Sequence, residues 1–219
     1  LNKTIILILV LGILVAGTVQ AATNKPNIVV VYVDDLGYGD VGCYGATEVQ
    51  TPAIDALAAE GLLFTDGHSS AATCTPSRYS LLTGSHAFRG KADILPGDAP
   101  LLIRPGTPTL PGMLQENGYK TAVIGKWHLG LGDGEVNWNG KISPGPLEIG
   151  FDYSYLIPAT GDRVPCVMVE NHHVVGLDPE DPIEVNYARQ IGTDKNGLEH
   201  PELLRYPADE QHAKTIVNG

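Results

Sequence analysis

The run "NIVVVYV" at residues 27–33 constrains the fold most, because it is apolar, rich in β-branched residues and uninterrupted. Such a run is typical of a strand that is buried on both faces in a parallel sheet. Asp34 and Asp35 follow it, and a glycine-rich turn comes next. Two adjacent carboxylates at the end of a buried strand are costly unless a cation or hydrogen-bond donors lie between them. They predict either ligands for Ca²⁺ or Mg²⁺ or, more commonly for an isolated pair, a solvated turn.

Helix and strand patterns alternate along the chain. A helix is predicted at 51–61, with Thr51 as its N-cap and Gly61 at its end. The other predicted elements, in chain order, are a strand at 62–64, a helix at 76–84, a helix at 109–118, a strand at 119–125, and short strands at 166–171 and 172–177. This alternation predicts an α/β fold with a mostly parallel sheet flanked by helices.

The charge balance of the chain argues against nucleic acid as a partner. The 219 residues carry a net charge of −11, which argues against a nucleic-acid surface. A small anionic substrate is still compatible with this balance, because a local cluster of cations overrides the global field. The length suits one sizeable domain.

The first residues have the pattern of an export signal. Lys3 precedes the apolar run "IILILVLGILVAG", and "VQA" places small or compact residues before a cleavage site after Ala21. We therefore expect a signal peptide at 1–21 and a periplasmic or secreted domain at 22–219, with no stable membrane insertion after cleavage. The alternative is a membrane anchor, for which the run is short.

The chain has three cysteines, Cys43, Cys74 and Cys166, so at least one thiol has no disulfide partner within the chain. A bridge between Cys43 and Cys166 stays open as an alternative. Cys74 lies in a loop rich in Ser, Thr and Pro, at or just before a predicted helix start, where amide N–H groups favour an anion. Arg78 shares a helix face with it at i and i+4. The pair indicates anionic chemistry, or else an ordinary cysteine in a capping loop.

Lys126 and His128 directly follow the predicted strand at 119–125. They are able to place two proton donors beside an anion, whereas the plainer interpretation is a surface lysine and a hydrogen-bonded histidine. Ligands in parallel sheets bind beyond the carboxyl ends of the strands. We therefore expect the acidic pair, the cysteine loop and this segment to meet at one edge of the sheet.

Three segments, in the same order, resemble the type I sulfatases of the alkaline phosphatase superfamily. Residues 74–84 match the family pattern C-x-P-S-R followed by L-x-T-G. The segment "NIVVVYVDDLGYGDVGCYG" resembles the first strand and metal-binding aspartates, and "GYKTAVIGKWHLG" resembles the second signature. The resemblance covers most of residues 26–160 and implies the N-terminal part of an alkaline phosphatase-like sulfatase core, incomplete at its C-terminus.

The resemblance implies that Cys74 is converted, before folding, to formylglycine by a dedicated maturation enzyme. One hydroxyl of the aldehyde hydrate would then attack the sulfur of a sulfate ester. The other would lose its proton and expel sulfate, so that the aldehyde is regenerated. The substrate would be a small-molecule or carbohydrate sulfate ester.

The resemblance also assigns roles to residues of this sequence. Asp34 and Asp35, with an oxygen of modified Cys74, would hold Ca²⁺, with Mg²⁺ as the alternative. Arg78 would steady the hydrate, Lys126 would bind sulfate oxygens, and His128 would accept the proton of the second hydroxyl. Thr160, in "IPATGDRVP", would support the hydrate. Arg163 in the same segment, which reaches substrate or pairs with Asp162, is left outside this set.

The family pattern departs from this sequence after residue 160. Sulfatases normally supply a further Asp with an Asn or Gln to the metal, and a second His and Lys, for which no counterpart is found in the sequence. Two alternatives therefore stand beside sulfate ester hydrolysis. One is phosphonate or phosphate monoester hydrolysis within the same superfamily, and the other is an inactive truncated exported domain that at most binds anions.

Overall fold

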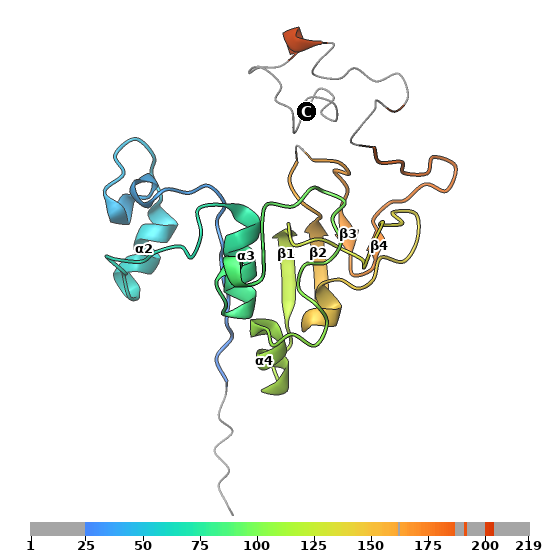
Figure 1. The fold of residues 1–219 in the computed structure, drawn as a ribbon. Coiled ribbons are helices and arrows are strands. Elements are labelled where there is room, and N and C mark those ends of the chain that lie inside the picture. Colours follow the sequence, from blue (N-terminus) through green and yellow to red (C-terminus); the bar gives the residue numbers. More distant parts are fainter. Residues whose placement is uncertain (1–24, 162, 187–190, 192–199, 204–219) are drawn as a thin grey trace, which may run out of the picture. The chain divides into compact units, whose positions relative to one another are not determined.

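The computed structural model describes residues 25–161, 163–186, 191 and 200–203 (Figure 1). The predicted signal peptide at 1–21 lies outside these residues. The chain divides into two compact units, Leu1–Gly61 and Leu62–Gly219, and each is described by itself. No helix within the described part is long and apolar enough to cross a bilayer.

The first unit contains the short 3-10 helices η1 (Tyr38–Asp40) and η2 (Gly42–Tyr44) and the helix α2 (Pro52–Glu60). The predicted helix is thus confirmed, with Pro52 as its first residue. Thr51 joins α2 to η2, because its Oγ1 accepts from the Gly42 N–H at 2.8 Å and donates to Asp55 Oδ1 at 3.0 Å. Asp55 in turn accepts from the Cys43 N–H.

The strand predicted at 27–33 does not form in this structure. These residues have no regular secondary structure, and Val29 and Val31 are 84% and 81% exposed. The apolar pattern predicts a buried strand, but a strand also needs a neighbour to pair its N–H and C=O groups, and none of the described strands pairs with this run. The strand predicted at 62–64 is wrong for the same reason, and Leu62 is 78% exposed.

The second unit is built on a four-stranded sheet of order β1-β2-β3-β4 (Figure 1). Strands β1 (Ala122–Lys126) and β2 (Tyr153–Ile157) are parallel, whereas β3 (Val169–Glu170) and β4 (His173–Val174) continue the sheet antiparallel. The described sheet is therefore mixed, so the prediction of a mostly parallel sheet holds only for the β1–β2 pair. Strands β3 and β4 fall within predicted segments, β1 overlaps the segment predicted at 119–125 and extends to Lys126, and β2 is not predicted.

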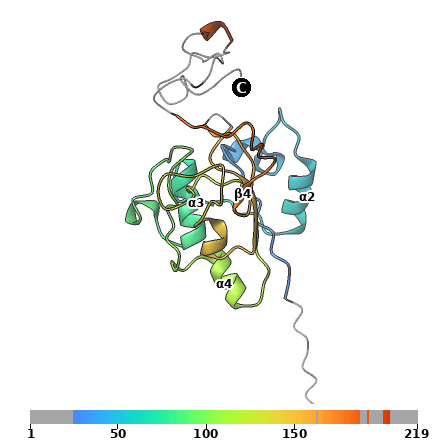
Figure 2. The same ribbon diagram turned by 90° about the vertical axis from the view of Figure 1, so that its right-hand side faces the viewer.

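Two helices of this unit position the residues of interest. Helix α3 (Cys74–Thr83) begins two residues before Pro76 and ends at Gly84, which has a φ of 66° and donates to the Ser80 carbonyl. Helix α4 (Leu110–Glu116) is capped by Thr109, whose side chain accepts from the Gly112 N–H at 3.1 Å. Both views show α4 near the end of α3 that is remote from Cys74 (Figures 1 and 2).

The core of the second unit includes the segment that leaves β1. Trp127, Leu129 and Leu131 are each at most 2% exposed, and the Trp127 Nε1–H donates to the Gly130 carbonyl at 2.7 Å. Gly130 has a φ of 76°, and a Cβ there would collide with the Pro100 carbonyl. Only glycine therefore lets the chain pass at this point. The other buried apolar members are Ile103, Trp138, Ile142, Ile149, Phe151, Leu156, Val169 and Val174.

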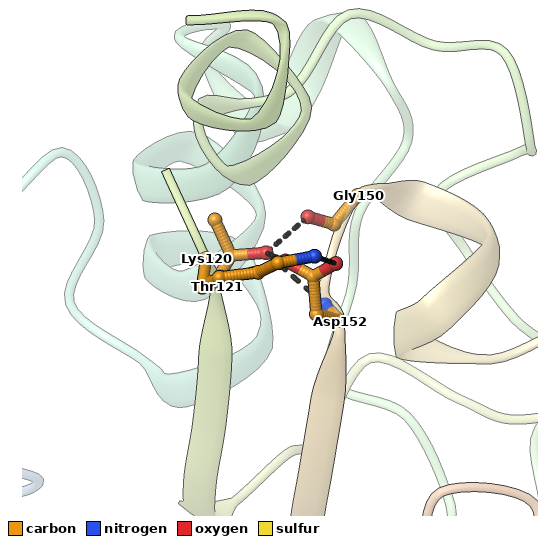
Figure 3. Close-up of polar contacts among 4 residues, drawn as sticks. All are labelled: Lys120, Thr121, Gly150 and Asp152. Atoms are coloured by element: carbon orange, nitrogen blue, oxygen red, sulfur yellow. Dashed lines mark hydrogen bonds and ion pairs between the residues drawn. The ribbon is translucent and has the colours of Figure 1, made fainter. Parts of the chain in front are cut away.

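A polar cluster joins the starts of β1 and β2 (Figure 3). The Thr121 N–H donates to Asp152 Oδ2 at 2.8 Å, and Thr121 Oγ1 donates to the Gly150 carbonyl at 2.7 Å. Lys120 Nζ lies 3.3 Å from Asp152 Oδ1. Hydrogen bonds lower the pKa of the Asp152 carboxyl from 3.8 to about 2, and the Thr121 N–H contributes most, followed by the side chain of Gln115. The cluster thereby sets the register of the parallel pair at one end.

We predict that Asp152→Asn lowers stability at neutral pH and makes it less sensitive to acid. A carboxyl whose pKa is depressed on folding stabilises the folded state above its unfolded pKa, and this contribution disappears as the pH falls through about 4 to about 2. Urea unfolding between pH 7 and pH 2 should show the two proteins converging in acid. Asp133→Asn, at an exposed position outside the cluster, serves as the control. A constant difference at every pH would contradict the prediction.

Candidate active site

The first turn of α3 is attached to the segment that follows β1. Thr75, which is fully buried, donates from Oγ1 to the His128 carbonyl at 2.8 Å and accepts from the Leu95 N–H at 3.4 Å. Cys74, the first residue of the helix, is half-buried beside it. The start of α3 therefore meets the carboxyl end of β1, as the sequence predicts for this pair of segments.

A second bond from the same helix reaches the last residue of β1. Arg78 Nη1 donates to the Lys126 carbonyl at 2.8 Å, and both residues are half-buried. Arg78 is four residues after Cys74 in the same helix, which is the i, i+4 relation expected from the sequence. The structure thus gathers Arg78, Lys126 and His128 around the start of α3.

His128 has a fixed backbone and a buried ring. Its φ is 55°, its N–H donates to the Pro158 carbonyl at 2.9 Å, and the residue is 1% exposed. The pKa of the imidazole is lowered from 6.5 to about 4, and burial is the largest cause. The positive charges of Lys126, Arg163 and Arg78 also lower it, whereas the contact with the Leu95 carbonyl raises it. The ring is therefore neutral at neutral pH.

Buried polar atoms of two predicted site residues, His128 and Thr160, have no hydrogen-bond partner among the described residues. They are Nδ1 of His128 and Oγ1 of Thr160. Buried polar atoms are normally paired, so orphaned ones mark a place where a ligand or water completes the bonding. Thr160 belongs to the turn after β2, where its carbonyl accepts from the Arg163 N–H at 3.3 Å. Both atoms belong to residues that the sequence predicts for the site.

The structure adds Arg163, which the sequence analysis left out of the site. Its Nη1 lies 3.0 Å from Nε2 of His128, although the two residues are 35 positions apart. The nearness of Arg163 to Thr160 was visible in the sequence, but the contact with His128 depends on how the turn after β2 folds back. Pairing of Arg163 with Asp162 lies outside the described residues.

Asp34 and Asp35 belong to the first unit, and both are exposed. Asp35 has a φ of 54°, which an Asp adopts more readily than most residues. Two adjacent carboxylates supply the hard oxygen donors that Ca²⁺ prefers, so their chemistry fits part of such a site. The described residues contain no group of three His, Cys, Asp or Glu side chains arranged to hold a metal ion. The metal ligands therefore stay a prediction.

The cysteines of the described chain form no disulfide, so Cys43 and Cys166 are not bridged in this structure. The Sγ of Cys166, an exposed residue, lies 3.1 Å from the Gly161 carbonyl, on the turn that carries Thr160. The Cys74 side chain is likewise not engaged in a bridge and stands at the start of a helix.

Comparison with known proteins identifies related sequences. A family model described as Sulfatase matches residues 26–155. An N-acetylgalactosamine-6-O-sulfatase of Bacteroides thetaiotaomicron is 52% identical over 199 residues, which are 90% of this chain and 39% of that protein. Human arylsulfatase A is 43% identical over 150 residues, or 67% of this chain and 28% of that protein.

A solved structure is also similar to this chain. One from work on the metabolism of multiple glycosaminoglycans by Bacteroides thetaiotaomicron superposes with a TM-score of 0.80 at 54% identity, covering 84% of this chain and 38% of that one. The chain thus spans 39% or less of the length of these relatives.

We predict that Thr75→Val destabilises the second unit. The substitution keeps the shape of the side chain but leaves the buried His128 carbonyl without this bond, which costs about 1–3 kcal/mol of unfolding free energy. Urea denaturation measures the loss. Thr83→Val is the matched control, because the Thr83 hydroxyl bonds the Tyr79 carbonyl within the same helix at 2.8 Å. The prediction is contradicted if both variants lose the same unfolding free energy, because the Thr75 bond would then contribute no more stability than a bond within the helix.

Proposed function

The chain belongs to the sulfatase family, and we propose that it carries the N-terminal part of the active site of an enzyme that hydrolyses sulfate esters. The observation that supports this most is the set of cations around a neutral, buried His128. Arg78, Lys126 and Arg163 all lower the pKa of its ring, so three positive charges act on His128. A local cluster of positive charge suits an anionic substrate.

Cys74 has the position that such an enzyme requires. It is the first residue of α3, where the N–H groups of the first turn and the helix dipole stabilise negative charge. Once modified to formylglycine, residue 74 would supply, as its hydrate, a nucleophilic hydroxyl and a second ionisable one. The orphaned Nδ1 of His128 and Oγ1 of Thr160 fit a polar, oxygen-bearing group of this kind.

His128 is suited to accept a proton. Because the pKa of the ring is lowered to about 4, the imidazole is unprotonated at neutral pH, and Nδ1 is buried without a partner among the described residues. We assign it to take a proton from a hydroxyl at position 74 during release of sulfate. Arg78, held by the Lys126 carbonyl, would offset negative charge at the start of α3, and Lys126 would bind sulfate oxygens.

Asp34, Asp35 and modified residue 74 are proposed to bind Ca²⁺, with Mg²⁺ as the alternative. When bound, the cation would lower the pKa of a hydroxyl and offset the charge of the sulfate. The two carboxylates are the donors of this chain that fit it, and a complete calcium shell needs 6–8 oxygen ligands, roughly, so further ligands are required.

The names of the relatives support a proposal for the substrate class. The sulfatase of Bacteroides thetaiotaomicron that is 52% identical acts, by its name, on a 6-O-sulfate of N-acetylgalactosamine. We therefore propose a sulfated carbohydrate as the substrate, and a formylglycine-forming maturation enzyme as a transient partner. Export of the chain, predicted from residues 1–21, is part of the same proposal.

The experiment starts with the full-length gene product, made together with a maturation enzyme. The peptide containing position 74 should be about 18 Da lighter than the cysteine form, since CH₂SH becomes CHO. The purified protein should hydrolyse an aryl sulfate faster than the matching aryl phosphate, and Cys74→Ala should abolish turnover while the protein remains folded.

Two results would count against the proposal. A lighter peptide with faster phosphate hydrolysis would favour the phosphomonoesterase alternative. An unmodified thiol at position 74 and no turnover would favour an inactive domain that binds anions. Arg89→Met, an exposed cation outside the site, is the control for effects of charge on the assay.

A further inference from the structure

The Nε2 atom of His128 faces two groups of opposite polarity. The Leu95 carbonyl oxygen lies 2.8 Å from it, and Nη1 of Arg163 lies 3.0 Å from it. A carbonyl oxygen only accepts hydrogen bonds, and a guanidinium only donates them. A ring nitrogen of a neutral imidazole carries either one hydrogen or one lone pair. Only one of these two contacts is therefore a hydrogen bond at any time.

The choice at Nε2 decides the chemistry of the other ring nitrogen. When Nε2 carries the hydrogen and donates to Leu95, Nδ1 has a lone pair and accepts protons. When Nε2 accepts from Arg163, Nδ1 carries the hydrogen and is a donor. Nδ1 is buried and has no partner among the described residues, so no described contact at Nδ1 fixes the outcome.

The guanidinium of Arg163 is also able to bond to an anion instead of to His128. It lies in the same cluster as Lys126 and Arg78, which act on the ring from β1 and α3. A guanidinium bonded to a neutral nitrogen gains less than one bonded to an oxyanion, because charge-assisted pairs with anions are shorter, stronger and often bidentate. An anion entering this cluster would therefore compete with His128 for Arg163.

We propose that Arg163 is a positioning residue that couples the presence of an anion to the position of the proton on His128. Without an anion, Arg163 donates to Nε2 and the hydrogen lies on Nδ1. With an anion, Arg163 turns to it, Nε2 takes a hydrogen and donates to the Leu95 carbonyl, and Nδ1 becomes the acceptor. The ring loses one proton to water and gains one from it, so its charge does not change.

The catalytic meaning of this coupling rests on the proposed function, because there Nδ1 accepts a proton from position 74. Nδ1 of His128 would then be able to accept a proton only when a sulfate group is bound. The coupling itself needs no turnover and is measured separately.

The experiment is nitrogen-15 NMR of the full-length gene product labelled at histidine, with and without inorganic sulfate at neutral pH. Loss of one resonance pair in His128→Gln assigns the ring. We expect the bare-nitrogen shift on Nε2 without sulfate and on Nδ1 with it. Arg163→Met should give the bare-nitrogen shift on Nδ1 under both conditions, since only Leu95 remains.

Two further variants complete the design. Arg163→Lys, which keeps the charge and a donor, should restore at least part of the sulfate response, and Arg89→Met should respond as the native protein does. The proposal is overturned if the native ring shows the same tautomer with and without sulfate, a result that does not depend on any variant. It is also overturned if Arg163→Met responds like the native protein. Absence of formylglycine or of turnover would instead count against the proposed function.

Discussion

The hydrogen bond from Thr75 Oγ1 to the His128 carbonyl, 2.8 Å long and fully buried, is the contact on which the rest of the site depends. Together with the bond from Arg78 to the Lys126 carbonyl, it attaches α3 to the end of β1 through backbone oxygens. Neither bond uses the His128 ring. The helix thus holds the chain in place while Nδ1 of His128 stays available for chemistry.

The same bond helps to maintain an uncommon backbone conformation. A φ of 55° at a residue other than glycine costs on the order of 1–3 kcal/mol. His128 is held there from both sides, because its N–H donates to the Pro158 carbonyl and its carbonyl accepts from Thr75. The buried Trp127 and Leu129 flank it. The strain is therefore sustained by the core, and Nε2 of the ring lies beside Leu95 and Arg163.

Local patterns predicted part of this arrangement. Pro and Gly lie within two residues of the limits of α2, α3 and α4, and the apolar run before Lys126 indicates β1. The meeting of the start of α3 with Lys126 and His128 is therefore predictable from the sequence. Arg163 was not, because its contact with His128 spans 35 residues and depends on a turn that no periodicity encodes. At residues 27–33, by contrast, the sequence predicts a strand that the structure does not contain. Apolar β-branched residues favour a strand, but they do not supply the neighbouring strand that it must pair with.

The charges of the site explain how its base and its ligand depend on each other. In the proposed site Arg78, Lys126 and Arg163 would attract an anion, and the same three charges oppose protonation of His128. An anion placed among them would offset part of this effect, so the pKa of the imidazole would rise toward its ordinary value of 6.5. A stronger base follows, since an imidazole with a higher pKa binds a proton more tightly. Under the proposed function, the anion that the cations bind would thus also make His128 a stronger base.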